Sequence, residues 1–336
     1  MAILITGGAG FIGSHLIERL LVESDDDLVC LDNFNNYYNP AIKRANAARF
    51  AAYERISVVE ESFCNAAAME QLFATRHISH VVHLGAYAGV RPSVQRPLVY
   101  EENNVRGTLV LLEAVRRFPV KRFLLISSST VYGRGASVPF QEDQPLGVPM
   151  SPYGATKRAA ELLGLTYRDL HDVPVVCLRP FSVYGPRLRP DLVMTIFTDA
   201  VLAGRSLPLY GDGTIRRDFT HVSDICSGLL AALHVENVVG ETINLGHHEP
   251  VEIGKLIALI EDASGRKANV DRRPGTPEDM PITCADLSKA QRLLGYRPQV
   301  KLADGVREFV DWFRSQGAAP TNGKPHASSR PALQDA

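Results

Sequence analysis

Cysteine is scarce in this chain, which has five in 336 residues. No two of them form a C-x-x-C pair, so neither a disulfide framework nor a zinc site is expected. Their odd number and wide spacing fit a reducing compartment, and we predict a cytoplasmic protein. They are Cys30, Cys64, Cys177, Cys226 and Cys284.

Net charge and long apolar runs are also lacking. The formal charge is -1 at pH 7, which argues against a protein that binds nucleic acid or other polyanions. No uninterrupted apolar run reaches the length of a membrane span, and the first apolar residues belong to a predicted strand, so no targeting segment is expected. His247, His248 and Glu249 are adjacent residues that rarely face one centre, so we predict no metal.

What is present begins with a short apolar strand, a glycine loop and a helix predicted from about Phe11 to Val22. Gly8, Gly10 and Gly13 fit G-x-G-x-x-G, in which glycine lets the backbone approach a pyrophosphate. A second apolar run ends at Asp32, where a carboxylate would bind a ribose 2′-hydroxyl and repel a 2′-phosphate. The pattern predicts a site for NAD rather than NADP, the alternative being a tight turn that binds no phosphate.

A phenol and an ammonium lie four residues apart in the stretch Ser151-Pro152-Tyr153-Gly154-Ala155-Thr156-Lys157. Ser151 can cap a helix that begins at Pro152, and residues i and i+4 share a helix face. Tyr153 and Lys157 can therefore point into one pocket, where a fixed cation favours a phenolate that accepts a proton from an alcohol. Alone, the same pattern is typical of an ordinary amphipathic helix.

A third stretch, from Phe123 to Gly133, reads as a buried strand that runs into hydroxyl side chains, Ser128 among them. Ligands of doubly wound sheets bind beyond the carboxyl ends of strands, which is where these hydroxyls fall. With the glycine loop, Ser128 and Tyr153-x-x-x-Lys157 in this order, the chain resembles extended short-chain dehydrogenase/reductases of the nucleotide-sugar epimerase and dehydratase group. The resemblance runs from Ala2 to about Phe313.

The resemblance implies an α/β fold, a Rossmann-type doubly wound parallel sheet with a smaller C-terminal substrate-binding lobe. We expect residues 1–180, with a return segment of about 221–250, to bind NAD. Residues 181–220 and 251–315 are expected to bind a nucleotide sugar, and residues 316–336 to form a disordered tail. Further predicted elements are helices over 41–53 and 98–118 and strands over 56–59 and 173–178.

The resemblance also implies roles for individual residues. Tyr153 would take the proton of a sugar C4 hydroxyl, Ser128 would bind that oxygen, and Lys157 would hold the nicotinamide ribose. Asn104 would contact the cofactor region, unless its amide merely satisfies nearby backbone. Including Tyr153 and Lys157, the predicted cofactor-binding residues are Gly7, Gly10, Phe11, Ile12, Gly13, Asp32, Asn33, Ser62, Phe63, Leu84, Gly85, Ala86, Asn104, Tyr153, Lys157 and Pro180. The predicted substrate-binding residues are Arg91, Ser127, Ser128, Ser129, Ser182, Arg189, Arg217 and Asp279.

The residues after Ser128 bear on the type of reaction. A 4,6-dehydratase of this group carries an acidic pair where this chain has Ser129 and Thr130, so dehydration is disfavoured. The stretches 32–38, 88–91 and 181–191 are similar to UDP-glucuronate 4-epimerases. This implies NAD-dependent epimerisation at C4 of a UDP-sugar through a 4-keto intermediate, foremost UDP-glucuronate to UDP-galacturonate.

Other functions stay open at this point. They are epimerisation of UDP-glucose or UDP-N-acetylglucosamine, decarboxylation of UDP-glucuronate, and, in a different class, regulation by a non-catalytic NAD-binding protein. The resemblance also suggests a homodimer, formed through helices around 99–118 and 152–171.

Overall fold

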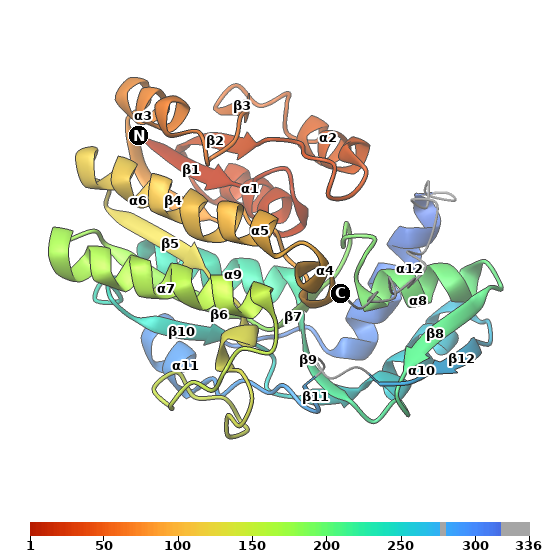
Figure 1. Ribbon diagram of the computed structural model, residues 1–336. Helices are drawn as coiled ribbons and strands as arrows, with labels where there is room; N and C mark the ends of the chain where they lie inside the picture. The colour runs from red at the N-terminus through yellow and green to blue at the C-terminus, as the bar shows by residue number, and fades with distance from the viewer. Residues whose placement is uncertain (276–279, 317–336) are drawn as a thin grey trace, which may run out of the picture.

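The computed structural model describes residues 1–275 and 280–316. A parallel seven-stranded sheet lies at its centre, in the order β10-β6-β5-β4-β1-β2-β3, so the predicted doubly wound sheet is confirmed (Figure 1). Its strands β1, β5 and β6 are buried along their whole length, as expected when both faces of a parallel sheet are covered. Its strands are β1 (Ala2–Thr6), β2 (Asp27–Asp32), β3 (Ile56–Glu60), β4 (Ile78–His83), β5 (Arg122–Ile126), β6 (Val175–Pro180) and β10 (Thr242–Leu245).

Two sets of helices cover the two faces of this sheet (Figure 1). On one face α1 (Phe11–Glu23) and α9 (Val222–His234) pack side by side within the larger hydrophobic core. On the other face α3 (Ala66–Thr75), α6 (Gly107–Arg117) and α7 (Pro152–His171) enclose a second core. The carboxyl ends of the parallel strands therefore share one open edge, where doubly wound sheets bind ligands.

Two small sheets lie beyond this edge. One contains β7 (Ser182–Tyr184), β9 (Arg216–His221) and β11 (Pro250–Glu252), and the other pairs β8 (Ser206–Tyr210) with β12 (Asn269–Arg273). The helices α8 (Val193–Leu202), α10 (Ile253–Ser264) and α12 (Leu302–Ser315) lie with them in Figure 1. The helix α11 (Ser288–Leu294) packs near β10.

The helix that carries Tyr153 begins as the sequence predicts. The Ser151 hydroxyl accepts a hydrogen bond from Gly154 N, and Pro152 occupies the first turn. Asp172 closes the helix in the left-handed conformation.

Some predicted boundaries were wrong. The helix predicted over 41–53 is α2 (Pro40–Ala48), because the buried Phe50 draws the following residues into turns. The helix predicted over 98–118 is α5 (Pro97–Tyr100), a π-helical segment (Glu101–Arg106) and α6, preceded by the unpredicted α4 (Val90–Gln95). The strand predicted over 173–178 lies two residues later, as β6.

The predicted tail lies outside the described residues from 317 onward. Among the helices that are described, none is both long and apolar enough to cross a membrane.

Candidate active site

The glycine loop joins β1 to α1 at the open edge of the sheet. Gly7 has a φ of 67°, and its N–H donates to the Leu31 carbonyl over 2.8 Å. A Cβ added at Gly13 would lie 2.4 Å from the Gly7 oxygen, so this position allows only glycine. A Cβ at Gly10 would meet, within the described residues, only the Gly7 oxygen at 3.0 Å. The loop therefore packs tightly inward and leaves its Gly10 side open to a phosphate, as the motif requires.

Asp32 ends β2 beside this loop. Its Oδ1 accepts hydrogen bonds from Phe34 N at 2.9 Å and from Lys43 Nζ at 3.0 Å. Its Oδ2 is buried and has no hydrogen-bond partner within residues 1–275 and 280–316. A buried acceptor without a partner costs free energy, and a ribose hydroxyl would satisfy it. The residues present thus fit the dinucleotide that the sequence predicts.

The other predicted cofactor-binding residues follow the same strand ends. Phe11 and Ile12 open α1, and Asn33 follows β2 and accepts from Asn35 N at 3.3 Å. Gly85 N donates to Thr6 Oγ1 at 3.0 Å, which holds the ends of β1 and β4 together. The topology thereby brings the predicted cofactor-binding residues to the edge of the sheet where the parallel strands end. These residues include Ser62 and Phe63 after β3, Leu84, Gly85 and Ala86 after β4, and Pro180 at the end of β6.

Asn104 lies in the π-helical segment, a feature common at functional sites. Its Oδ1 accepts from Tyr87 N at 2.8 Å, and its Nδ2 donates to Tyr87 O at 2.9 Å and to Thr156 Oγ1 at 3.1 Å. The amide therefore holds the loop after β4 against α7. This is the backbone-satisfying alternative raised above, and a contact with the cofactor stays a prediction.

The three predicted catalytic residues lie in the turn after β5, which holds Ser128, and on α7, which holds Tyr153 and Lys157. Lys157 Nζ is buried and donates to the Ile126 carbonyl at 2.7 Å. The buried Ser128 caps a 3-10 turn, and its oxygen accepts from Thr130 N at 3.2 Å and from Thr130 Oγ1 at 3.0 Å. Because both of these bonds use Ser128 as an acceptor, its own O–H can be donated to the Tyr153 phenol.

Two opposing sets of effects act on the pKa of the Tyr153 phenol. Burial raises the pKa of its phenol, whereas a hydrogen bond with Ser128 and the charge of Arg189 lower it. Burial lowers the pKa of Lys157 to about 8, partly offset by the charge of Glu161. Arg189 is therefore a cation that acts on the pKa of Tyr153 and that the sequence did not single out for this role, and the tuning of Tyr153 by Lys157 stays a prediction.

One buried ion pair was missed in the sequence. Glu161, one helical turn after Lys157, accepts from Arg179 Nε at 2.9 Å and from Nη2 at 2.8 Å. Both side chains are about 95% buried, with relative exposures of 4% and 5%. The i+4 spacing from Lys157 to Glu161 could have signalled a second charge on the same helix face.

The predicted substrate-binding residues are more dispersed. Arg189 pairs with Asp191 on the loop after β7, and Arg217 in β9 donates to the Met280 carbonyl at 2.6 Å. The guanidinium of Arg91, in α4, lies 4.0 Å from the centre of the Tyr210 ring. The hydroxyl residues are Ser127 and Ser129, buried beside Ser128, and the half-buried Ser182 at the start of β7. Asp279 lies outside the described residues.

Comparisons with known proteins agree with this geometry. The family model described as GDP-mannose 4,6-dehydratase matches residues 4–309. The UDP-glucuronate 4-epimerase of Thermodesulfobacterium geofontis is 38% identical over 312 residues, which cover 93% of this chain and 95% of that protein.

Solved structures are similar over almost the same span. The UDP-glucuronic acid 4-epimerase from Bacillus cereus, in complex with UDP-glucuronic acid and NAD, has a TM-score of 0.90 and 37% identity and covers 94% of this chain and 100% of its own. The UDP-glucose 4-epimerase from Thermotoga maritima, with UDP-glucose, has a TM-score of 0.86 and 30% identity over 94% and 99% of the two chains. The chain therefore belongs to the nucleotide-sugar epimerases and dehydratases of the extended short-chain dehydrogenase/reductase family.

Proposed function

We propose that this chain epimerises C4 of UDP-glucuronate with NAD as its cofactor. The observation that carries the proposal is the turn after β5, where Ser128 forms a hydrogen bond with Tyr153 and its neighbours Ser127 and Ser129 are buried neutral hydroxyl residues. A dehydratase of this family has an acidic pair directly after the Ser128 position, and Ser129 and Thr130 cannot do that acid-base work. The similarity to proteins named UDP-glucuronate 4-epimerase supports the same substrate.

When bound, NAD supplies the acceptor and then the donor of the C4 hydride. Tyr153, as a phenolate, accepts the proton of the C4 hydroxyl and later returns it to the same oxygen. Ser128 would hydrogen-bond that oxygen in place of the Tyr153 phenol, and the charge of Arg189 favours the phenolate that the reaction needs. Lys157 holds the nicotinamide ribose from its position at the Ile126 carbonyl.

The nucleotide sugar would be held by the lobe of residues 181–220 and 251–315. Arg217 and Arg91 would bind the diphosphate, because a guanidinium binds phosphate oxygens through two parallel hydrogen bonds. Arg189, on the loop after β7, and the hydroxyl of Ser182, at the start of β7, would bind the uronate. Asp279 belongs to the same proposed set.

A homodimer through α6 and α7 belongs to the proposal, as does a cytoplasmic location. Leu98 next to these helices is 80% exposed, and Leu162 on α7 is 60% exposed, which supports an interface there. A monomer at micromolar concentration in light scattering would contradict the dimer.

The test is a panel of nucleotide sugars, each incubated with the purified protein and read by NMR for inversion at C4. UDP-galacturonate formed from UDP-glucuronate supports the proposal. A UDP-pentose product would indicate a decarboxylase, and inversion of UDP-glucose or its N-acetyl analogue would indicate a different epimerase. Bound NAD that never becomes NADH with any UDP-sugar would favour a non-catalytic regulator.

A further inference from the structure

The loop after β7, residues 185–191, carries two arginines with separate partners. Gly185 has a φ of 139° and Arg187 a φ of 66°, a left-handed conformation that a residue with a Cβ seldom adopts. Leu188 is buried and its N–H donates to Gly185 O at 3.2 Å, which makes the loop compact. An arginine in the left-handed conformation is strained, so contacts with other parts of the fold must stabilise it, and these contacts show which element the loop packs against.

The contact that holds Arg187 is an ion pair with Glu18 on α1. Arg187 Nη1 donates to Glu18 Oε1 at 2.8 Å and Nη2 to Oε2 at 2.7 Å, and only 9% of the Arg187 side chain is exposed. Burial alone would raise the pKa of Glu18, but hydrogen bonds from Arg187 and Arg49 hold it at about 2. Glu18 therefore stays ionised at neutral pH, on the same helix that begins at the glycine loop.

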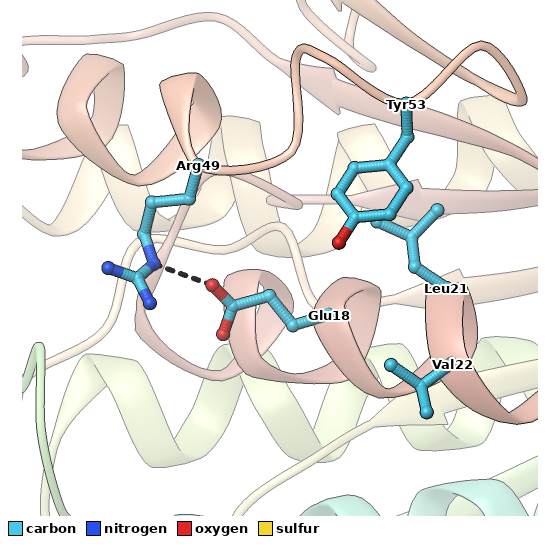
Figure 2. Close-up of a pocket in the computed structure, with 5 residues that line it drawn as sticks. All are labelled: Glu18, Leu21, Val22, Arg49 and Tyr53. Atoms are coloured by element: carbon cyan, nitrogen blue, oxygen red, sulfur yellow. Dashed lines mark hydrogen bonds and ion pairs between the residues drawn. The ribbon is translucent and has the colours of Figure 1, made fainter.

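Arg49 provides a natural comparison. Figure 2 shows its guanidinium facing Glu18 from the end of α2, at the rim of a surface hollow lined by Leu21, Val22 and Tyr53. Its Nε donates to Glu18 Oε1 at 2.5 Å, yet 57% of its side chain is exposed. Arg49 and Arg187 thus share one carboxylate, but only Arg187 belongs to the loop.

Two residues after Arg187, Arg189 lies in a second bidentate pair. Its Nε and Nη2 donate to Asp191 at 2.9 and 2.8 Å, and its guanidinium lies 5.5 Å from the Tyr37 ring centre. The Tyr37 hydroxyl also donates to Asp191 Oδ2, at 3.3 Å. Two residues of chain span at most about 7 Å, so the backbone of Arg189 stays within that distance of the backbone of Arg187.

We propose that the Glu18–Arg187 ion pair positions this loop against α1 and thereby sets where the charge of Arg189 stands relative to Tyr153. Arg187 is a positioning residue, which acts on the reaction through Arg189. The inference rests on the proposed function for its turnover assay. The charged and titratable groups that act on the Tyr153 phenol are Arg189 from the loop and Tyr100 from α5. The Tyr100 and Tyr153 rings lie 6.2 Å apart, and the hydroxyls of Tyr100 and Tyr37 both donate to the Ala88 carbonyl, so the Tyr37 ring that Arg189 faces belongs to the same cluster.

The experiment compares R187Q and E18Q with R49Q as the matched control. The charge of Arg189 lowers the pKa of Tyr153, so loss of its position should raise the pKa seen in the acid limb of the kcat profile. For R187Q and E18Q we expect an upward shift of about 0.5–1 pH unit, which lowers the rate on that limb about 3–10-fold. R49Q should keep the wild-type profile. NAD binding and the melting temperature, measured for each variant, establish that it is folded and loaded.

Some results of these measurements would support the proposal, and one would overturn it. Partial recovery in R187K and an R187Q/E18Q double variant no worse than either single variant support a shared interaction. Identical acid limbs for R187Q and R49Q, both folded with NAD bound, would overturn it. If R187Q fails to fold, the proposal is tested with E18Q and E18D, whose pH profiles of kcat are compared with that of R49Q in the same way.

A wild type that accepts no uronate contradicts the proposed function and leaves this comparison intact. The profiles are then recorded as NADH formation with whichever UDP-sugar reduces the bound NAD.

Discussion

Lys157 and Ile126 are joined by one hydrogen bond, in which the buried Nζ donates to the carbonyl oxygen at 2.7 Å. The bond ties α7 to the end of β5, two residues before Ser128. The protein itself therefore holds the ammonium, the phenol-bearing helix and the serine in a common frame. This arrangement places the chemistry at a rigid strand end rather than on a loop.

Tyr153→Phe should lower turnover by roughly 10²–10⁴-fold, because the ring stays and only the proton acceptor is lost. NAD should remain bound, as measured by absorbance of the purified protein. Tyr167→Phe on the same helix is the control, since its hydroxyl binds Glu113 at 2.6 Å, away from Ser128. A wild-type rate in the Tyr153 variant would disprove the role of the phenolate.

Asp32→Ala should relax the preference for NAD over NADP. The change removes the carboxylate that repels a 2′-phosphate and leaves its partner, Lys43 Nζ, as a nearby cation. Dissociation constants for both dinucleotides measure the effect, with Asp27→Ala at the opposite end of β2 as the control. An unchanged preference would shift the discriminating role to Asn33.

Ser182→Ala combined with Ser129→Ala should raise the UDP-pentose by-product and NADH release relative to epimerised uronate. A 4-keto hexuronate is a β-keto acid, which loses carbon dioxide once its carboxylate bond stands perpendicular to the ketone plane. Hydrogen bonds to a charged group reach about 3 kcal/mol, so two lost hydroxyls weaken the restraint on that carboxylate. Product analysis with UDP-glucuronate decides, and partitioning equal to that of an exposed Ser206→Ala control would refute the restraint.

Acid should destabilise the fold through His83. Its ring lies fully buried between Thr6 Oγ1 at 2.8 Å and Thr108 Oγ1 at 3.1 Å, and burial together with the charge of Lys157 lowers its pKa to about 3. Between pH 6.5 and 3 the unfolded chain binds a proton that the folded chain excludes, so stability falls as pH falls. The loss approaches about 1.4 kcal/mol per pH unit in that window.

The measurement for His83 is urea unfolding at several pH values, compared with His83→Gln. The variant should lose less stability than the wild type between pH 6.5 and 4, whereas His77→Gln, at an exposed position, should follow the wild type. Parallel curves for wild type and His83→Gln would contradict the prediction.

The sequence alone was sufficient for features that depend on short spacings. The glycine loop, the carboxylate of Asp32 after an apolar run, and the four-residue step from Tyr153 to Lys157 follow from the geometry of one strand, one turn or one helix. Parallel strands then bring their carboxyl ends to one edge of the sheet, so the residues predicted to bind the cofactor lie at that edge whatever the other tertiary contacts are.

Only the tertiary structure determined which charges act on which groups. Glu18 and Arg187 are 169 positions apart, and Arg179 reaches Glu161 from a different element. Asn104 lies in a π-helical segment and its amide binds Tyr87, a contact that the sequence did not indicate, while its contact with the cofactor stays a prediction. The charge of Arg189, on the loop after β7, acts to lower the pKa of Tyr153, and no periodicity along the chain predicts this because the fold sets the distance between charges on different elements.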